Sequence, residues 1–499
     1  MLYEASSSGI TKLGPASSET EPLLRSHSRS LSRTPAEHGE DVENANTGSF
    51  TDDVPDNKRQ LGLLSAASLI FNRVIGTGVF AAPSIILNSS GSVGMTFVMW
   101  ILGALVSAAG TAVYVEFGTG LPRSGGEKTY MEYVFRRPAF LTTCVYAVYG
   151  NVCINIAVVS NMLIFILDVL HALAYERTPT NVRIVAFLCS TFCLIVHGAF
   201  FKSGLKLQNA LGAFKLAVLV LIAGSGFLSL IGVPGFAVGE DYDQPNNYTW
   251  QTFWEGSNFG ANAFVIGMYN VIWSYIGYSN ANYALSEVRD PVRTIKVAAP
   301  LAMSFVAFAY VSVNVAYFAV VSKADMLNGG TIPAALFFRN LYGPSTERAL
   351  SVVISLSMLG NMLSTLFAQG RDSSYPLALF NLVISGGLLL LYTDAFKSYD
   401  WNPPFRAYKF AVVFFFLSNA FLVLVPMIPP TSGYEPYLHL PYYSHVVGAL
   451  SVGLLGAVYW FIFFRWIPKR NGYTLKQVTV IQEDGVPRSV FRRIPAGAE

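Results

Sequence analysis

The chain has 499 residues, of which 53% are hydrophobic and only 13% are charged, and its mean hydropathy is +0.44. A soluble domain carries roughly 25% charged residues. This chain has too few charges to cover a surface that faces water, so much of it must contact lipid, and a soluble globular protein is excluded. The net charge of +3 says little by itself, and the positions of the charges are more informative.

The predicted elements begin with a polar N-terminal tail. Residues 1–58 are rich in Ser, Thr, Glu and Pro and are predicted to form a disordered cytoplasmic segment. A transmembrane domain is predicted at 59–468, and residues 469–499 form a basic tail that is predicted to be cytoplasmic. Within the domain, eleven apolar runs are each close to the ~20 residues that cross a bilayer as a helix. They lie at about 61–87, 95–120, 139–170, 183–201, 207–232, 262–286, 298–321, 347–369, 374–393, 408–428 and 442–466.

The positions of Lys and Arg predict the orientation of these spans, because cytoplasmic loops carry an excess of both residues. The sequons at Asn88 and Asn247 then fall on the outer side. Through the eighth span the pattern therefore favours a cytoplasmic N-terminus. With that orientation, the cytoplasmic loops hold Arg123, Lys128, Arg136, Arg137, Lys202, Lys206, Arg289, Arg293 and Lys296, against Arg177, Lys323 and Arg339 in the outer loops.

The same rule fails after the eighth span. That span ends in the cytoplasm near Arg371, and the ninth run starts almost at once at about Ser374, so the C-terminus would finish outside. Yet the loop after the ninth run and the C-terminal tail are both rich in Lys and Arg. An additional span between Arg371 and Ser374 would restore agreement, so one transmembrane helix is expected to be missing there. The alternative is that the eighth and ninth runs do not both cross the membrane.

The first apolar run contains residues that weaken a helix at its centre. Gly76, Thr77 and Gly78 lie in the middle of the run, and Pro83 follows them. A helix broken in mid-membrane exposes backbone N–H and C=O groups, and the N-terminus of its second half can hold a carboxylate. The alternative is that the two glycines only allow close packing against another helix.

The sixth run has a similar irregularity. Between Trp273 and Tyr283, Ser, Asn, Gly and Tyr residues crowd the expected centre of the bilayer, where polar groups are costly and tend to line a cavity. The first and sixth runs head the two halves of a five-plus-five arrangement. Breaks at corresponding positions of two halves are typical of the binding site of a transporter.

Three charged residues within apolar runs are candidates for ion coupling or gating. Lys215, in the fifth run, must pair, snorkel or lose its proton, and it is a candidate for a fixed cation that replaces a coupling sodium ion. Because it lies near the cytoplasmic end of its run, snorkelling is the alternative. Arg73 and Glu116 could each be a gate charge or a member of a structural pair.

No sequence pattern indicates an enzyme. The chain contains no phosphate-binding loop, no nucleophile triad and no spacing of Cys or His that is typical of a metal site. Its four Cys residues lie in apolar runs, as small core residues do. We therefore expect no cofactor, no metal ion and no nucleic-acid partner.

Three segments together resemble the amino acid–polyamine–organocation superfamily, in its L-type amino acid transporter branch and closest to the fungal high-affinity methionine permease group. They are the first-span motif at 72–80, the segment PRSGGEKTYMEY at 122–133 and the segment NANYALSEVRDP at 280–291. The likeness covers about residues 60–370 and 373–466.

The resemblance implies the leucine-transporter fold, an all-α polytopic membrane fold with two inverted five-helix repeats whose first and sixth helices are unwound at the site. Trp273 would close the site as an aromatic gate. Lys215 matches the lysine that the family carries at the sodium-site position, which implies coupling to protons rather than to sodium. The implied substrate-binding residues are Ile75, Gly76, Thr77 and Gly78 for the carboxylate, Trp273, Ser274 and Ile276 for the α-amino group, and Tyr275, Gly277, Tyr278 and Ser279 around the side chain.

The resemblance is interrupted where the charge rule fails. Members of the family continue after a segment like that ending at Arg371 with a cytoplasmic loop, a ninth helix and an outer loop, and resume at a segment like 373–381. About 50–60 residues, enough for one span and its loops, are therefore expected to be absent. The second repeat would have four helices, and a mispredicted intron is the simplest explanation.

These features predict a secondary active transporter of neutral L-amino acids, methionine or cysteine first, that works by proton-coupled alternating access. Its expected partners are the amino acid, protons and membrane lipid, and its expected location is the plasma membrane, with the vacuole or another endomembrane as alternatives. One rival hypothesis is a sensor that binds an amino acid without transporting it. Another is an inactive, truncated transporter that results from a faulty gene model.

Overall fold

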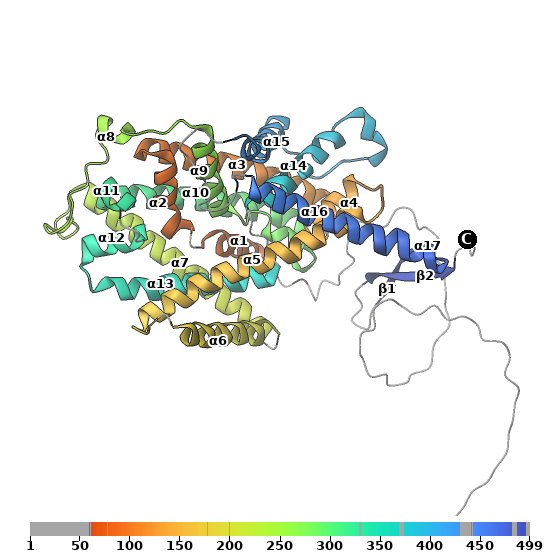
Figure 1. The fold of residues 1–499 in the computed structure, drawn as a ribbon, viewed down its shortest axis with the longest axis horizontal. Helices are drawn as coiled ribbons and strands as arrows, with labels where there is room; N and C mark the ends of the chain where they lie inside the picture. Colours follow the sequence, from red (N-terminus) through yellow and green to blue (C-terminus); the bar gives the residue numbers. More distant parts are fainter. Residues whose placement is uncertain are drawn as a thin grey trace, which may run out of the picture. The chain divides into compact units, whose positions relative to one another are not determined.

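The computed structural model is mostly helical and describes residues 59, 61–76, 78–176, 178–198, 200–328, 332–368, 374–429, 441, 443–481 and 487–495 (Figure 1). The predicted tail at 1–58 lies outside these residues. The longer helices are α1 Leu63–Val74, α2 Gly78–Ser90, α3 Val93–Gly120, α5 Leu141–Ala172, α6 Pro179–Gly198, α7 Phe201–Leu230, α9 Ala261–Tyr275, α10 Pro291–Val320, α13 Thr346–Ala368, α14 Ser374–Leu391, α15 Lys409–Leu424 and α16 Ser444–Phe461. The shorter elements are α4 Glu127–Val134, α8 Trp250–Trp254, η2 Asn280–Glu287, α11 Lys323–Asn328, α12 Pro333–Tyr342, η3 Asp394–Tyr399, η4 Val425–Met427, η5 Ile462–Trp466, α17 Ile467–Asn471, β1 Tyr473–Ile481 and β2 Pro487–Pro495.

Each of the eleven predicted apolar runs contains a helix. Among the described residues, five helices are long and apolar enough to cross a membrane, or six if the bent pair α1 and α2 forms one span. Leu141–Gly150, Ala349–Leu363 and Pro376–Leu391 are shorter apolar stretches within the described residues. The five are Val93–Gly120, Lys206–Leu230, Pro291–Val320, Lys409–Met427 and Val446–Asn471.

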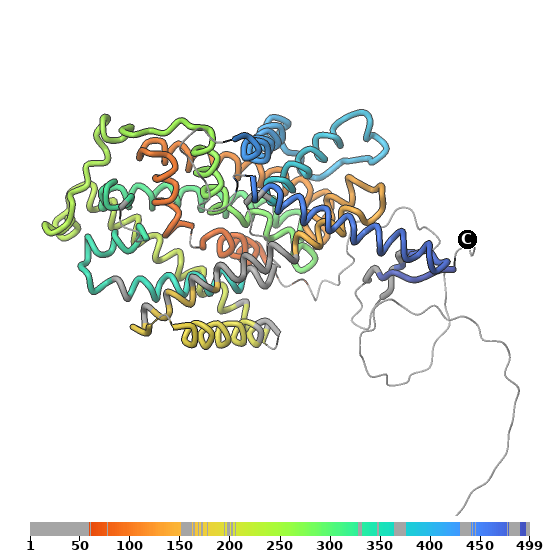
Figure 2. Tube along the Cα trace, viewed as in Figure 1, coloured from red at the N-terminus to blue at the C-terminus, as the bar shows by residue number. Residues whose placement is uncertain are grey.

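Small residues set the spacing of the central helices, in which α10 packs on α1, α3 and α7 (Figure 2). A Cβ atom placed on Gly226 of α7 would lie only 2.2 Å from the Cβ of Ala316 in α10. One placed on Gly103 of α3 would lie 2.2 Å from a methyl group of Val271 in α9. Only glycine allows such close contact, and membrane helices depend on close packing because lipid gives them no hydrophobic reason to associate.

The two ends of the bundle are called the α12 end and the α4 end, after the short helices found there. Hydrogen bonds hold the chain together at each end. At the α12 end, Asn340 donates its side-chain amide to the carbonyl of Val320, 3.1 Å away. At the α4 end, the backbone N–H of Ser124 donates to the hydroxyl of Ser286 at 3.1 Å. The α12 end also contains Asn247, which is buried and donates to the carbonyls of Phe318 and Val321. The sequon at Asn247 therefore helps to close the end of α10, and its amide is not exposed for a glycan.

Helices α13 and α14 run in the same direction, although only residues 369–373 separate them. Helix α13 starts directly after α12 and passes the middle of the bundle at Asn361, which bonds to Arg73 next to the break between α1 and α2. Helix α14 passes the middle at Asn381, which bonds to Tyr278, and is followed at the α4 end by Tyr392, which donates to Glu116 near the end of α3. Both helices therefore run from the α12 end towards the α4 end.

The described residues divide into two compact units, one within 59–460 and a smaller one within 461–495. The described part of the smaller unit contains η5, α17 and an antiparallel hairpin of β1 and β2. Gly472, at a φ of 68°, adopts the left-handed conformation that ends α17 and starts the turn into β1.

Candidate functional site

The first predicted break is present between α1 and α2. Helix α1 ends at Val74, Ile75 has extended backbone angles, and α2 starts at Gly78 with an axis bent by 42° from that of α1. Thr77, which the resemblance assigns to the carboxylate, lies outside the described residues. The conformation fits the sequence, because Gly76 and Gly78 favour the interruption.

The carbonyl groups freed at the end of α1 are satisfied by side chains from three other helices. Lys215 of α7 donates to the carbonyls of Asn72 and Ile75, at 3.1 and 2.5 Å. Asn361 of α13 donates its amide to the carbonyl of Arg73 at 2.9 Å. The hydroxyl of Tyr310 in α10 lies 2.9 Å from the carbonyl of Val74. A break in mid-membrane is tolerated only when such donors replace the lost helical bonds.

Lys215 is buried, with 1% of its surface exposed, and its ammonium lies at the negative end of the α1 dipole. A Cβ atom on Gly360 of α13 would lie 3.3 Å from its Cε atom, so α13 packs directly against the lysine side chain. Snorkelling towards the membrane surface, the alternative left by the sequence, does not occur. The ammonium instead binds the unwound backbone of the first span.

The second predicted break follows α9. Helix α9 ends at Tyr275, Ile276 has extended backbone angles, and Gly277 has a φ of 135°, which L side chains rarely adopt. The chain then continues as the 3-10 helix η2 from Asn280. A Cβ atom on Gly277 would lie 2.8 Å from side-chain atoms of Arg73 and Val74, so the two breaks are in direct contact.

Tyr310 connects the ends of the two interrupted helices. Its hydroxyl lies 2.9 Å from the carbonyl of Val74 and 2.8 Å from that of Ser274, so one buried hydroxyl serves the C-terminal ends of both α1 and α9. The sequence pattern does not single out this residue, because a tyrosine in an apolar run is more often a core residue.

Replacing Tyr310 with Phe is expected to destabilise the protein by about 1–3 kcal/mol, because two buried carbonyls lose their shared donor. The midpoint of thermal unfolding in detergent would measure the effect. Tyr317→Phe is a matched control, since Tyr317 is equally buried in α10 and its hydroxyl has no hydrogen-bond partner among the described residues. Equal midpoints for the two variants would contradict the bridging role.

The other predicted residues of the sixth span lie at or beside the second break. Ser274 is buried against Gly78, where an added Cβ atom would lie 2.5 Å from its Oγ, whereas Trp273 is only partly buried. Tyr275 packs edge-on against Trp100, with ring centroids 5.9 Å apart, within an aromatic cluster of α3, α9 and α10. The structure thus brings together the described backbone of both halves of the predicted binding site, at Ile75–Gly78 and at Ser274–Ser279.

A network of buried hydrogen bonds links the second break to α4. Asn381 of α14 donates its amide to the hydroxyl of Tyr278 at 3.0 Å. The hydroxyl of Tyr114 in α3 lies 2.9 Å from the amide oxygen Oδ1 of Asn381 and 2.8 Å from a carboxylate oxygen of Glu127. Tyr283 of η2 donates to the same carboxylate. The sequence does not reveal these partners, because they come from four elements far apart in the chain.

The two candidate gate charges occupy different places. Arg73 lies beside the first break, where it donates to the side-chain oxygen of Asn361 at 3.2 Å. Glu116 lies in α3 near the α4 end and accepts bonds from Trp401 at 2.9 Å, from the backbone N–H of Ala407 at 2.8 Å and from Tyr392. These donors belong to the connection between α14 and α15, so the carboxylate of Glu116 anchors that connection to α3.

No group of three or more His, Cys, Asp or Glu side chains that could hold a metal ion occurs in the described part of the chain. The polar groups around the two breaks are mainly backbone carbonyls, hydroxyls, amides and the cations of Lys215 and Arg73. Such groups can bind the ends of a small zwitterion.

Comparisons with known proteins agree with this arrangement. A family model for the amino acid permeases matches residues 61–373. The high-affinity methionine permease of Saccharomyces cerevisiae is 35% identical over 510 aligned positions, which cover 89% of this chain and 86% of that protein. Its low-affinity methionine permease is 28% identical, and the human Asc-type amino acid transporter 1 is 29% identical. Each of these two matches covers 63% of this chain, and they cover 56% and 58% of those proteins.

A solved structure of Mhp1, a nucleobase-cation-symport-1 family transporter, aligns with 85% of this chain and 96% of its own, with 12% identity and a TM-score of 0.42. The family model alone covers more than half of the chain, and the 35% identity extends along most of both proteins. The chain therefore belongs to the amino acid permease family, and it is an integral membrane transporter rather than an enzyme.

Proposed function

We propose that this protein is a secondary active transporter of neutral L-amino acids, with methionine or cysteine as the preferred substrate. The observation that carries the proposal is the contact between the two broken helices, which places polar backbone groups of both halves at one buried position. The similarity to two methionine permeases supports the choice of substrate class.

In this proposal the substrate binds between the two breaks. The positive N-terminal end of α2, beginning at Gly78, would hold the carboxylate, together with the backbone of Ile75, Gly76 and Thr77. The negative C-terminal end of α9 would hold the α-amino group, through the backbone of residues from Trp273 to Ile276. Trp273 would close the site, and Tyr275, Tyr278 and Ser279 would shape the space for the side chain.

Coupling to protons is proposed to depend on Lys215. Its ammonium binds two carbonyls of the unwound first span, and in its absence a bound cation would have to bind them. A change of charge at this position would alter how tightly α7 holds the end of α1. Alternating access would then follow from differential binding of substrate and proton by the outward-open and inward-open states.

Gly76→Val is expected to reduce uptake of methionine to background without lowering the amount of protein at the cell surface. A Cβ atom at Gly76 would lie 2.9 Å from Nδ2 of Asn361, so valine would press on the site itself. Gly224→Val is the control, because Gly224 is exposed in α7 and no described atom lies within 4 Å of its added Cβ atom. Uptake retained by Gly76→Val, at equal surface amounts, would refute this site.

A fold with one helix fewer than the family is also proposed, and three observations support it. Helices α13 and α14 run in the same direction, although consecutive spans of a membrane protein alternate in direction. The family model ends at residue 373. In addition, 89% of the 499 residues is about 444, so about 66 of the 510 positions aligned with the high-affinity methionine permease face a gap in this chain.

A fold that lacks one helix would favour the rival hypothesis, an inactive product of a faulty gene model. Sequencing the transcript across the codons for Ser364 to Leu377 distinguishes this rival hypothesis from the proposed transporter. Additional codons for an apolar helix would restore antiparallel neighbours for α13 and α14. A transcript that matches the present sequence would favour an inactive product or a sensor that binds without transport.

The orientation and location of the protein are proposed from charge alone. Lys and Arg in the loops favour a cytoplasmic N-terminus, and a restored helix would place the basic C-terminal tail in the cytoplasm as well. The plasma membrane is the proposed location.

A further inference from the structure

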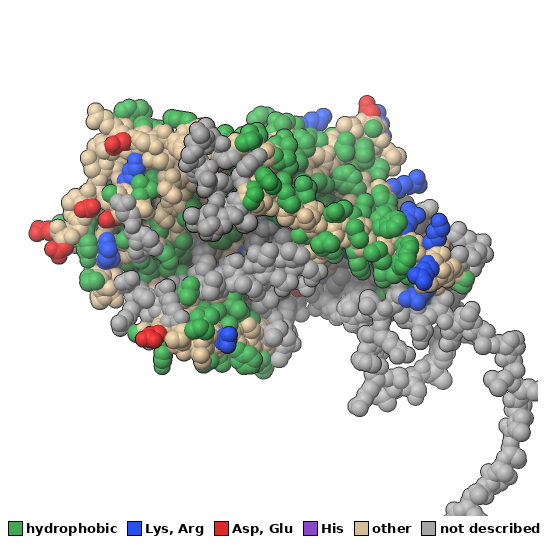
Figure 3. Space-filling view, in the orientation of Figure 1, with side chains coloured by type: hydrophobic (Ala, Val, Ile, Leu, Met, Phe, Trp, Pro, Cys, Tyr) green, Lys and Arg blue, Asp and Glu red, His purple; other side chains and the backbone are tan. Residues whose placement is uncertain are grey.

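The segment that follows the last span carries an excess of positive charge. The parts 461–481 and 487–495 contain seven Lys and Arg residues and no Asp or Glu, and the connecting residues 482–486 add Glu483 and Asp484. Six of the seven have described side chains, and all six are exposed; they are Arg465, Lys469, Arg470, Lys476, Arg492 and Arg493. Figure 3 shows Lys and Arg side chains gathered in this part of the molecule.

The strand register separates the hairpin into two different faces. Directly paired residues lie on the same face of a two-stranded ribbon, and Lys476 pairs with Arg492. Like charges in directly opposite positions destabilise a sheet unless an anion balances them. The same face includes Val478 and Val490, which pair with each other and are only partly buried. It therefore combines cations with small apolar side chains.

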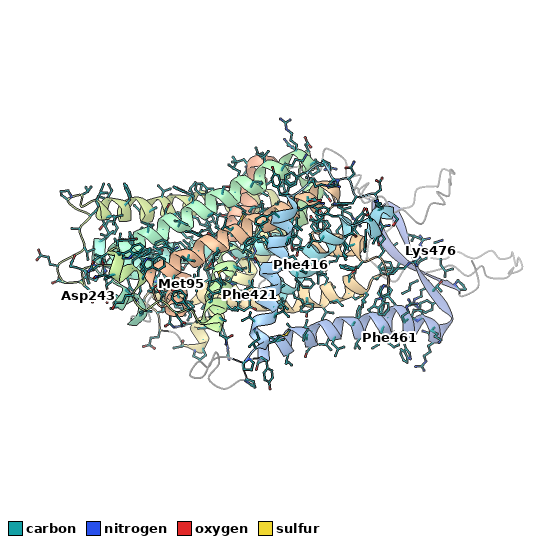
Figure 4. All side chains as sticks on the ribbon, turned by 90° about the horizontal axis from the view of Figure 1, so that it is seen from above. Met95, Asp243, Phe416, Phe421, Phe461 and Lys476 are labelled. Carbon is teal, nitrogen blue, oxygen red and sulfur yellow. The ribbon has the colours of Figure 1, made fainter. Side chains whose placement is uncertain are left out.

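The opposite face of the hairpin packs on η5, within the same compact unit. Phe491 of β2 contacts Phe464 of η5, with ring centroids 5.4 Å apart. Phe464 belongs to the apolar candidate span Val446–Asn471. Trp466 is exposed, and the guanidinium of Arg470 lies 5.3 Å from the centre of its ring. Exposed Trp residues of this kind are typical of a membrane interface. The contact therefore holds the hairpin beside η5, whose residues are typical of a membrane interface. Figure 4 labels Lys476 on the hairpin and Phe461 at the end of α16.

We propose that the face of the hairpin with Lys476 and Arg492 is a docking surface for anionic phospholipid headgroups of the cytoplasmic leaflet. Charge complementarity supports this partner, because clusters of basic residues directly after a transmembrane helix bind anionic lipids. The valines of the same face can enter the boundary between headgroups and acyl chains. The inference rests on the cytoplasmic C-terminus proposed above, but not on the substrate site.

The test uses the full-length protein in nanodiscs, where both membrane faces are accessible. A polarity-sensitive dye on Thr474→Cys reports the environment of this face, because Thr474 is exposed and lies two residues from Lys476. The unmodified chain controls for labelling of its native cysteines, of which the described three are buried. We expect a blue-shifted emission with about 30% phosphatidylserine in phosphatidylcholine, and its loss in pure phosphatidylcholine or at about 1 M salt.

The double variant Lys476→Glu with Arg492→Glu is expected to shift the docking equilibrium by about 25-fold or more, since each charge near an anionic surface contributes about fivefold. Lys397→Glu is the matched control, because Lys397 is exposed but already paired with Asp394 at 2.8 Å. An emission that is the same in both lipid mixtures, or a shift that persists in the double variant, would overturn the proposal. A shift produced in pure phosphatidylcholine by inorganic phosphate would do so as well, by assigning the surface to a free anion. Methionine uptake is not the readout, so failure here leaves the proposed transport untouched.

Discussion

Lys215→Met is expected to abolish amino acid uptake. Methionine has a similar length and fits an apolar interior, but it donates no hydrogen bond. The carbonyls of Asn72 and Ile75 would lose the ammonium that binds them. Each buried carbonyl left without a donor costs about 1–3 kcal/mol, which is enough to displace the unwound backbone that forms half of the proposed site.

The measurement compares initial rates of methionine uptake at equal surface amounts. Lys206→Met is the control on the same helix, since Lys206 is exposed. Lys215→Arg should also fail, because α13 packs so closely that a Cβ atom added to Gly360 would lie 3.3 Å from the lysine Cε, which leaves no room for a guanidinium. Normal uptake by Lys215→Met would show that the cation neither holds the site nor couples transport.

Gly277→Ala is expected to destabilise the protein more than Tyr310→Phe does. Its φ of 135° is strained for alanine, which costs about 1–3 kcal/mol. The new Cβ atom would also lie 2.8 Å from side-chain atoms of Arg73 and Val74 and 3.1 Å from the backbone nitrogen of Val74, and overpacking of this kind costs about 1–3 kcal/mol more. The two effects act together, and both push the broken helices apart.

Gly343→Ala separates strain from contact. Gly343 also has a positive φ, of 86°, but no described atom lies within 4 Å of its added Cβ atom, so it measures backbone strain alone. The thermal unfolding midpoint of Gly277→Ala should fall well below that of Gly343→Ala, and methionine uptake should be lost only in the former. Equal midpoints would mean that the two breaks do not press on each other at Gly277.

The helices and the positions of the two breaks can be predicted from the sequence for local reasons. A run of apolar residues in lipid must be helical, and glycine in its middle weakens the helix, so Gly76 and Gly277 mark the two interruptions. The charge rule also predicts a missing span after Arg371, and this stays a prediction.

The donors that satisfy the breaks could not be predicted from the sequence. Tyr310, Asn361 and Asn381 are single polar residues in apolar helices, and which carbonyl each one reaches depends on how helices far apart in the chain pack together. Glu116 shows the same limit. Its place within a span suggests a gate, but three donors from the connection between α14 and α15 surround it.

Transport is tested most directly by uptake of radiolabelled L-methionine into vesicles that contain the protein made from its native transcript. We expect accumulation above that of empty vesicles, an increase under an inward proton gradient, and no accumulation by Gly76→Val. Binding of methionine without any accumulation in the same vesicles would contradict transport and favour a sensor.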